Sequence, residues 1–251
     1  MMQYKSIIPL LISFPFIFFS CTKGGNNEPP QEKEYEEFNT EVSGFSGLCY
    51  GPNNTSFYAV SDKYGIYELR FDGSTKRKLP FTGINDFEAI TINRTTGRIY
   101  LADEALMNIY FLSSDEQSIN LVTNINVPGG VSNKGIEGLT YGRDTLYTIN
   151  QESPTILIKY SLASQTEVSR TQVSFALYLS DIFFDASDNT LWICDSQQKK
   201  IFHCNLGGEV IASQAIDYVP KAEALVIDRI ANVAWVGCDQ TAKLFRIKLS
   251  I

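Results

Sequence analysis

The chain has 251 residues, of which 44% are hydrophobic and 12% aromatic, so it can bury a substantial core and suits an all-β protein. Its formal net charge is −7 at pH 7, and no extended lysine-rich or arginine-rich run offsets this charge. Because an acidic surface repels phosphate backbones, we expect no nucleic-acid partner.

The N-terminus resembles an export signal. Lys5 precedes an apolar run over residues 7–19, which matches a signal-peptide hydrophobic region and is too short to span a bilayer. The run ends at Ser20-Cys21, and a small residue before a cysteine at this place resembles the bacterial lipobox. We therefore expect residues 1–20 to be a lipoprotein signal peptide and Cys21 to carry the lipid. The alternative is an ordinary signal peptide followed by an unmodified cysteine.

A lipid on Cys21 would attach the exported chain to a membrane of the bacterial cell envelope, and we expect the outer membrane. Residues 22–33 are polar, contain glycine and proline, and include no apolar residue. We therefore predict that residues 21–33 form a flexible tether and that residues 34–251 form the folded domain.

Five copies of one unit follow along the chain. Each copy begins with a residue that we call the anchor, and the anchors are Ser46, Glu88, Glu137, Ser180 and Glu223. The anchors are 42, 49, 43 and 43 residues apart. After each anchor come a strand-like segment, a turn rich in Gly, Asn or Asp, a second strand-like segment and a third apolar segment. This period predicts an all-β fold, a five-bladed β-propeller.

The fourth, outer strand of each blade is less regular. The candidates are residues 76–81, 119–127, 168–177 and 210–219. The fifth copy has no such segment, because the sequence ends directly after its third strand, while residues 35–42 are left over at the other end. We therefore predict that this N-terminal strand pairs with the fifth blade and closes the ring, which removes the open sheet edges.

Several short stretches match one protein family. The most specific is Asn-Lys-Gly-Ile-Glu-Gly-Leu at residues 133–139, and shorter pieces lie at 41–44, 57–62, 66–69, 72–73, 86–90 and 222–225. Together they resemble the SdiA-regulated family of five-bladed propellers, which is distantly related to NHL-repeat proteins. Ala89 and Ala224 depart from the glycine that is usual there. The resemblance implies a five-bladed fold and a calcium ion in a shared site, but no established reaction.

Three of the anchors are glutamates. If the anchors are equivalent, Glu88, Glu137 and Glu223 meet at one mouth of the central channel, where they must be neutralised by protons, a cation or basic side chains. Because oxygen-only ligands suit Ca²⁺, we predict that these three residues bind calcium. The alternative is that Lys134 and Lys221 neutralise their neighbours as ordinary ion pairs.

Further acidic residues lie near the same mouth. Asp103, Asp195 and Asp239 occur where second strands end, and Asp86 lies two residues before Glu88. We predict that these four aspartates contact a ligand. The alternative is that the aspartates at the strand ends cap turns, which is a common role.

Other catalytic groups are scarce. Cys49, Cys194, Cys204 and Cys238 lie in apolar runs without the spacing of a zinc site or disulfide scaffold, so we expect buried structural thiols. The single histidine, His203, lies in a third strand and is expected to pack rather than to act as a base. An enzyme on this chain would have to be metal-assisted.

The sequence thus favours a cell-envelope lipoprotein whose calcium-binding propeller binds an unknown small molecule or protein at the channel mouth. The alternative is a calcium-dependent hydrolase of lactonase or phosphoester-hydrolase type.

Overall fold

The computed structural model describes residues 33–63, 65–83, 86–130 and 134–251. The predicted signal peptide, Cys21 and nearly all of the predicted tether lie outside these residues. The folded unit spans Glu34–Ile251. No helix in the described part of the chain has the length and hydrophobicity that a membrane span requires.

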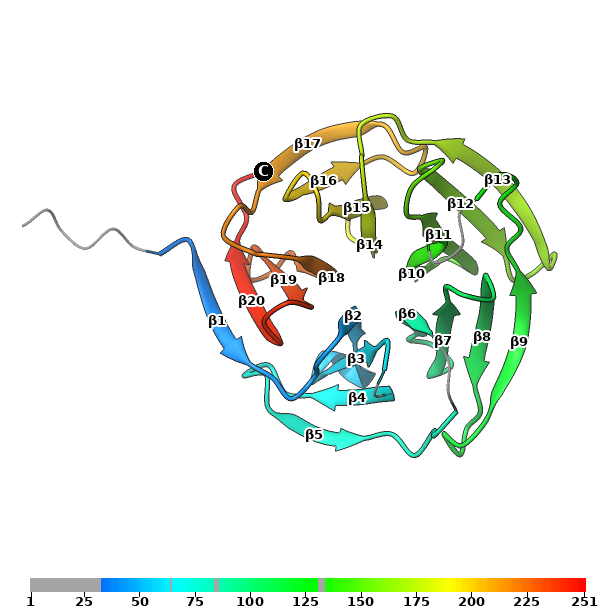
Figure 1. The fold of residues 1–251 in the computed structure, drawn as a ribbon, viewed down its shortest axis with the longest axis horizontal. Coiled ribbons are helices and arrows are strands. Elements are labelled where there is room, and N and C mark those ends of the chain that lie inside the picture. Colours follow the sequence, from blue (N-terminus) through cyan, green and yellow to red (C-terminus); the bar gives the residue numbers. More distant parts are fainter. Residues whose placement is uncertain (1–32, 64, 84–85, 131–133) are drawn as a thin grey trace, which may run out of the picture. The chain divides into compact units, whose positions relative to one another are not determined.

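The described residues of the folded unit form five four-stranded antiparallel sheets in a ring, so the predicted five-bladed propeller is confirmed (Figure 1). From the channel outward, blade one is β2 (Phe45–Tyr50), β3 (Phe57–Ser61), β4 (Gly65–Leu69) and β5 (Thr75–Lys78). Blade two is β6 (Phe87–Asn93), β7 (Arg98–Asp103), β8 (Asn108–Leu112) and β9 (Ile119–Asn124). Blade three is β10 (Ile136–Gly142), β11 (Thr145–Asn150), β12 (Ile156–Ser161) and β13 (Thr166–Gln172).

Blade four is β14 (Leu179–Asp185), β15 (Thr190–Asp195), β16 (Lys200–Cys204) and β17 (Val210–Ala215). Blade five is β18 (Ala222–Asp228), β19 (Val233–Cys238), β20 (Lys243–Lys248) and β1 (Tyr35–Asn39). The N-terminal strand β1 pairs antiparallel with β20, from Tyr35 opposite Ile247 to Asn39 opposite Lys243. The predicted closure of the ring is therefore confirmed, and blade five combines both ends of the folded unit.

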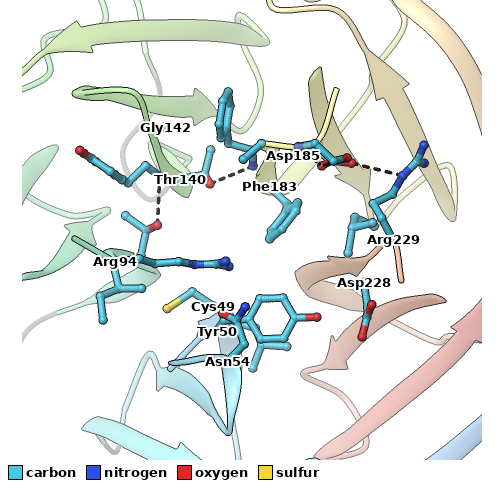
Figure 2. Close-up of a pocket in the computed structure, with 18 of the residues that line it drawn as sticks. Cys49, Tyr50, Asn54, Arg94, Thr140, Gly142, Phe183, Asp185, Asp228 and Arg229 are labelled. Atoms are coloured by element: carbon cyan, nitrogen blue, oxygen red, sulfur yellow. Dashed lines mark hydrogen bonds and ion pairs between the residues drawn. The ribbon is translucent and has the colours of Figure 1, made fainter. Parts of the chain in front are cut away.

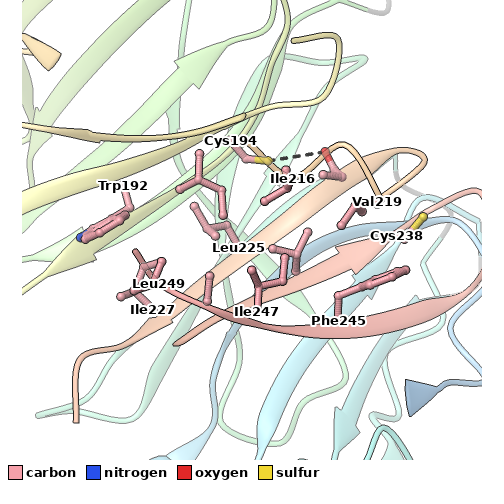
Figure 3. Packing of buried hydrophobic residues seen from close by; sticks show 14 residues of the cluster. Trp192, Cys194, Ile216, Val219, Leu225, Ile227, Cys238, Phe245, Ile247 and Leu249 are labelled. Carbon is pink, nitrogen blue, oxygen red and sulfur yellow. Dashed lines mark hydrogen bonds between the residues drawn. The ribbon is translucent and has the colours of Figure 1, made fainter. Parts of the chain in front are cut away.

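The core lies between neighbouring blades. The second strands β3, β15 and β19 are buried at every residue, because each lies between two other strands and under the faces of two adjacent sheets. Figure 3 shows one such cluster, to which blade four contributes Trp192 and Cys194 and blade five contributes Leu225 and Phe245. Burying each such side chain stabilises the fold by about 1.5–3 kcal/mol. All four cysteines of the described chain are buried and unpaired, which fits structural thiols.

Side chains join the innermost strands of neighbouring blades. Because adjacent blades belong to separate sheets, the inner backbone N–H groups need partners other than a strand ladder. The N–H of Tyr141 donates to Thr91 Oγ1 at 3.0 Å, and the N–H of Phe184 donates to Thr140 Oγ1 at 2.9 Å. Asp181 has the same role between blades four and five, since its Oδ2 accepts from the N–H of Leu225 at 2.6 Å.

Candidate functional site

The five anchors occupy one equivalent structural position. In every blade the pairing between the first and second strands shifts by one residue, and the residue at the shift is the anchor: Ser46, Glu88, Glu137, Ser180 and Glu223. Such a β-bulge changes the direction of its side chain. Glu88 is half-buried and the other four anchors are buried. The repeat that the sequence shows is therefore a repeat of bulges that face one mouth of the channel.

A second set of residues lies beside the anchors, and we call them the rim residues. They follow the second strand of each blade directly, and they are Asp62, Glu104, Gln151, Ser196 and Asp239. Each rim residue donates its backbone N–H to the carbonyl oxygen two residues before the anchor, over distances of 2.8 to 3.2 Å. This fivefold contact fixes the rim residues next to the anchors.

Carboxyl groups from blades two and three come together at this mouth. One oxygen each of Asp86, Glu88 and Glu104 lies within 4.8 Å of the others. Glu104 also accepts a hydrogen bond from the N–H of Gly135 at 2.9 Å and is hydrogen-bonded to the carboxyl group of Glu137. We call Asp86, Glu88, Glu104 and Glu137 the acidic cluster.

Burial and mutual repulsion perturb the acidic cluster. Burial, assisted by the charges of Asp86 and Glu104, raises the pKa of Glu88 to about 8, although Ser46 donates a hydrogen bond to it. Burial and the charges of Glu88 and Glu223 raise the pKa of Glu137 well above its usual range. Burial also raises the pKa values of Asp86 and Glu104. Without a counter-charge, Glu88 therefore stays largely protonated at neutral pH, and the pKa values of the other three groups are shifted in the same direction.

The third predicted metal ligand lies in a different environment. Lys221 Nζ lies 3.3 Å from Glu223 and 2.7 Å from Asp239. Burial raises the pKa of Glu223 to about 7, against the lowering effect of Lys221. The charges of Glu88 and Glu223 both raise the pKa of Glu137, so the structure brings the three glutamates to one mouth of the channel. Glu223, however, already pairs with Lys221.

The alternative that Lys134 neutralises Glu137 does not match the structure. Lys134 lies three residues before Glu137, yet its ammonium group pairs with Glu152. Glu137 instead accepts a hydrogen bond from the side-chain amide of Gln151. Blade three therefore keeps a carboxyl group that the neighbouring lysine does not neutralise directly.

The four aspartates predicted to contact a ligand divide into two groups. Asp86 belongs to the acidic cluster, and Asp239 is a rim residue paired with Lys221. Asp103 and Asp195 are the last residues of their strands, and they accept hydrogen bonds from turn N–H groups, at Leu106 (2.9 Å) and Gln198 (2.7 Å). For these two aspartates the geometry favours the turn-capping alternative.

Sequence reasoning did not select Glu104, the neighbour of Asp103. Successive residues of a strand point to opposite sides, so only one of two adjacent acidic residues can face the anchors. The rim residue is always the one after the strand ends, and this offset from the anchor, 16 residues in most blades, is the signal that identifies it.

Comparison with known proteins places the chain among its relatives. A sequence model described as SdiA-regulated matches residues 31–215, which cover blades one to four. The chain belongs to the SdiA-regulated family. The glutaminyl cyclase of Myxococcus xanthus is similar in structure, with a TM-score of 0.65 and 13% identity, over 85% of this chain and 94% of that one.

Two further solved structures resemble this SdiA-regulated propeller. Virginiamycin B lyase of Staphylococcus aureus gives a TM-score of 0.53 at 16% identity, over 82% of this chain and 67% of that one. A chain of a nidogen/laminin complex gives a TM-score of 0.57 at 14% identity, over 82% and 76%. At these identities the likeness extends to the fold alone.

The donors at the acidic mouth of the SdiA-regulated protein fit a hard cation. All of them are oxygens, which Ca²⁺ prefers and zinc does not. Asp62 Oδ1 and Gln151 Oε1 are buried there, and neither accepts a hydrogen bond from a residue that the structure describes. Asp62 approaches so closely because Gly44, at φ 66°, has no Cβ, which would lie 2.0 Å from Asp62 Oδ1.

The raised pKa values predict a pH dependence in chelator. Glu88 and Glu223 have folded-state pKa values of about 8 and about 7, above the usual glutamate value. Between about pH 4.5 and 8 the folded state therefore binds more protons than the unfolded state, so stability falls as pH rises through this window. We expect urea unfolding in EDTA to show a loss of roughly 5 kcal/mol from pH 5 to pH 8.

Glu88→Gln serves as the control, because it removes one of the titrating groups and should flatten the curve. A stability that is constant or rises between pH 5 and pH 8 in chelator would contradict this prediction.

Proposed function

We propose that this SdiA-regulated propeller binds a calcium ion in the acidic cluster. The observation that carries the proposal is that oxygens of Asp86, Glu88 and Glu104 lie within 4.8 Å of one another in a largely buried mouth. Ca²⁺ takes six to eight oxygen ligands, so Glu137 and the buried Oε1 of Gln151 are the natural additions. The bound ion would supply the positive charge that these carboxylates need to ionise together.

The proposed role of the protein is that of a binding module in the bacterial cell envelope, attached by a lipid on Cys21. A rigid propeller presents its channel mouth as a concave surface, and calcium there would leave coordination positions for oxygens of a small molecule or protein. Burial and the charges of Glu137 and Glu223 raise the pKa of Tyr178 to about 12, so its phenol stays a hydrogen-bond donor beside the mouth.

A binding role is supported by the position of the histidine. The ring of His203 stacks on Trp192 with a centroid separation of 4.2 Å, and its Nε2 lies 2.9 Å from Thr190 Oγ1. Burial lowers the pKa of His203. These contacts belong to the packing of blade four rather than to the acidic cluster.

The calcium proposal predicts a metal-dependent melting temperature. We expect the protein without its predicted signal peptide to melt about 5–10 °C higher in 1 mM Ca²⁺ than in EDTA, if calcium exceeds its Kd about 100-fold. Glu104→Gln should abolish this shift, because it removes one of the three clustered carboxylates. The measurement is differential scanning calorimetry, combined with elemental analysis of the dialysed protein.

Glu116→Gln is the matched control. Glu116, in the turn between β8 and β9, pairs with Arg77 of the outer strand β5, away from the anchors, so this variant should keep the full calcium shift. Equal melting temperatures in calcium and chelator, with no bound metal, would refute the proposal. A full shift in Glu104→Gln would refute the assignment of the ligands.

A further inference from the structure

A second site lies at the opposite mouth of the channel. The anchors lie near the start of the innermost strands, whereas a cavity of about 620 Å³ opens where the same strands end, at Tyr50, Gly142 and Asp185 (Figure 2). Its volume is in the range of small-molecule pockets. Arg94 directly follows the far end of β6 and lies six positions after Glu88, which corresponds to roughly 20 Å along a strand. No residue of the acidic cluster lines this cavity.

The cavity has an apolar floor and aromatic walls. Side chains of Leu48, Leu139, Ile182 and Ile227, one from each of four blades, form part of the lining. In Figure 2 the ring of Phe183 projects into the middle of the space, and Tyr50 lies across from it. Phe71 is 39% exposed and Ile230 fully exposed in the lining. A flat apolar group in this space would be covered on several sides.

Most charged groups of the lining are already paired. Arg229 Nε lies 3.4 Å from Asp185, and its guanidinium lies 5.4 Å from the ring of Trp192. Asp228 accepts a hydrogen bond from the hydroxyl of Tyr50 and another from the N–H of Ala231 at 2.9 Å. Both aspartates of the lining and one of its three arginines therefore already have partners within the protein.

Arg94 is different. Its guanidinium lies 5.1 Å from the ring centroid of Tyr50, and no carboxylate among the described residues pairs with it. In Figure 2 this guanidinium points across the cavity toward Phe183. The lining contains Arg94, Arg143 and Arg229 against two aspartates, which leaves one net positive charge in the cavity. A guanidinium fork matches the two oxygens of a carboxylate.

We propose that this cavity binds a small molecule with one carboxylate and a flat, apolar or aromatic body. Arg94 binds the carboxylate through two parallel hydrogen bonds, and the body lies against Phe183 and Tyr50. One negative charge balances the net charge of the lining, whereas a dianion would exceed it. This site is independent of calcium at the acidic mouth.

The test uses 2-naphthoate as the probe and 2-naphthamide as its neutral counterpart, measured by isothermal titration calorimetry in EDTA. We expect the wild-type protein to bind 2-naphthoate at least about tenfold more tightly than 2-naphthamide. Arg94→Gln should remove this difference and leave the affinity for 2-naphthamide unchanged. The matched control is Arg98→Gln, because Arg98 lies in the same blade, 4.6 Å from the ring of Phe111, and outside the cavity.

A ¹⁵N–¹H NMR titration of the wild-type protein locates the probe without a variant. Shifts should concentrate on the cavity lining, including Leu48, Leu139 and Phe183. No binding of 2-naphthoate at millimolar concentration, equal affinity for the two probes, or an unchanged affinity in Arg94→Gln would overturn the proposal. Shifts centred on the anchors would overturn it as well. The calcium proposal can fail without affecting any of these results, since all of them are obtained in chelator.

Discussion

A chain that begins at residue 43, and therefore lacks β1, is expected to lose cooperative folding. The deletion removes the outer strand of blade five, whose five residues pair with β20. Thr40 also binds the carbonyl oxygen of Ala242 through both its N–H and its hydroxyl, each at 3.0 Å. Without these contacts β20 becomes an open edge, which favours aggregation.

The side chains of this segment contribute to the core. The ring of Tyr35 stacks on Tyr218 with centroids 4.1 Å apart, Phe38 lies against Trp235, and Val42 is completely buried. Losing these three side chains costs about 5 kcal/mol, at 1.5–3 kcal/mol for each one fully buried. Because domains are stable by only about 5–15 kcal/mol, a loss of this size removes most of the stability.

The matched control is a chain that begins at Lys33 and keeps β1. Circular dichroism during heating should show a cooperative transition for this control and a broad or absent one for the shorter chain. A peptide of residues 33–42 added to the shorter chain should restore the transition by strand addition. A shorter chain that melts cooperatively within about 2 °C of the control would contradict the role assigned to β1.

The second large effect is expected at Asp181. Its Oδ1 accepts from the N–H of Ile182 at 2.8 Å, and its Oδ2 accepts from the N–H of Leu225 at 2.6 Å. The N–H of Leu48 also donates to this carboxyl group, so one side chain joins blades one, four and five. Asp181→Ala leaves three inner-strand N–H groups without an acceptor, at about 1–3 kcal/mol each.

We therefore expect Asp181→Ala to lower the free energy of urea unfolding by about 3–6 kcal/mol. Asp181→Asn keeps an acceptor oxygen and should lose less. Asp115→Ala is the control for removing an aspartate that caps an exposed turn, and it should change stability little. A wild-type unfolding curve for Asp181→Ala would mean that other groups satisfy these N–H donors.

The fold was predictable because the sequence repeats the same pattern of strands and turns five times. Five anchors at near-constant spacing indicated both the number of blades and their strand order, and the unused segment at residues 35–42 indicated the closure. The outer strands were less accurate, since β5, β9, β13 and β17 all end before the predicted limits. Outer strands face solvent on one side, so their polar residues show little of the pattern that marks a buried strand.

The site was only partly predictable, for two physical reasons. Sequence proximity suggested that Lys134 pairs with Glu137, but its side chain reaches Glu152 in the turn between β11 and β12 instead. Similarly, the pair Asp103-Glu104 does not reveal which residue faces the channel, because that depends on where β7 ends. The cavity around Arg94 could not be predicted at all, because its lining combines the ends of inner strands with the turns that follow them, from all five blades.

The bulge shared by all five blades has one more consequence. It separates the residue that faces the channel mouth from the hydrogen-bonded ladder, so the identity of that residue is not constrained by strand pairing. The residue at this position is serine in blades one and four and glutamate in the other three blades. Substitutions at the five anchor positions can therefore change the charge of the channel mouth one blade at a time, while the strand pairing that holds the ring together is kept.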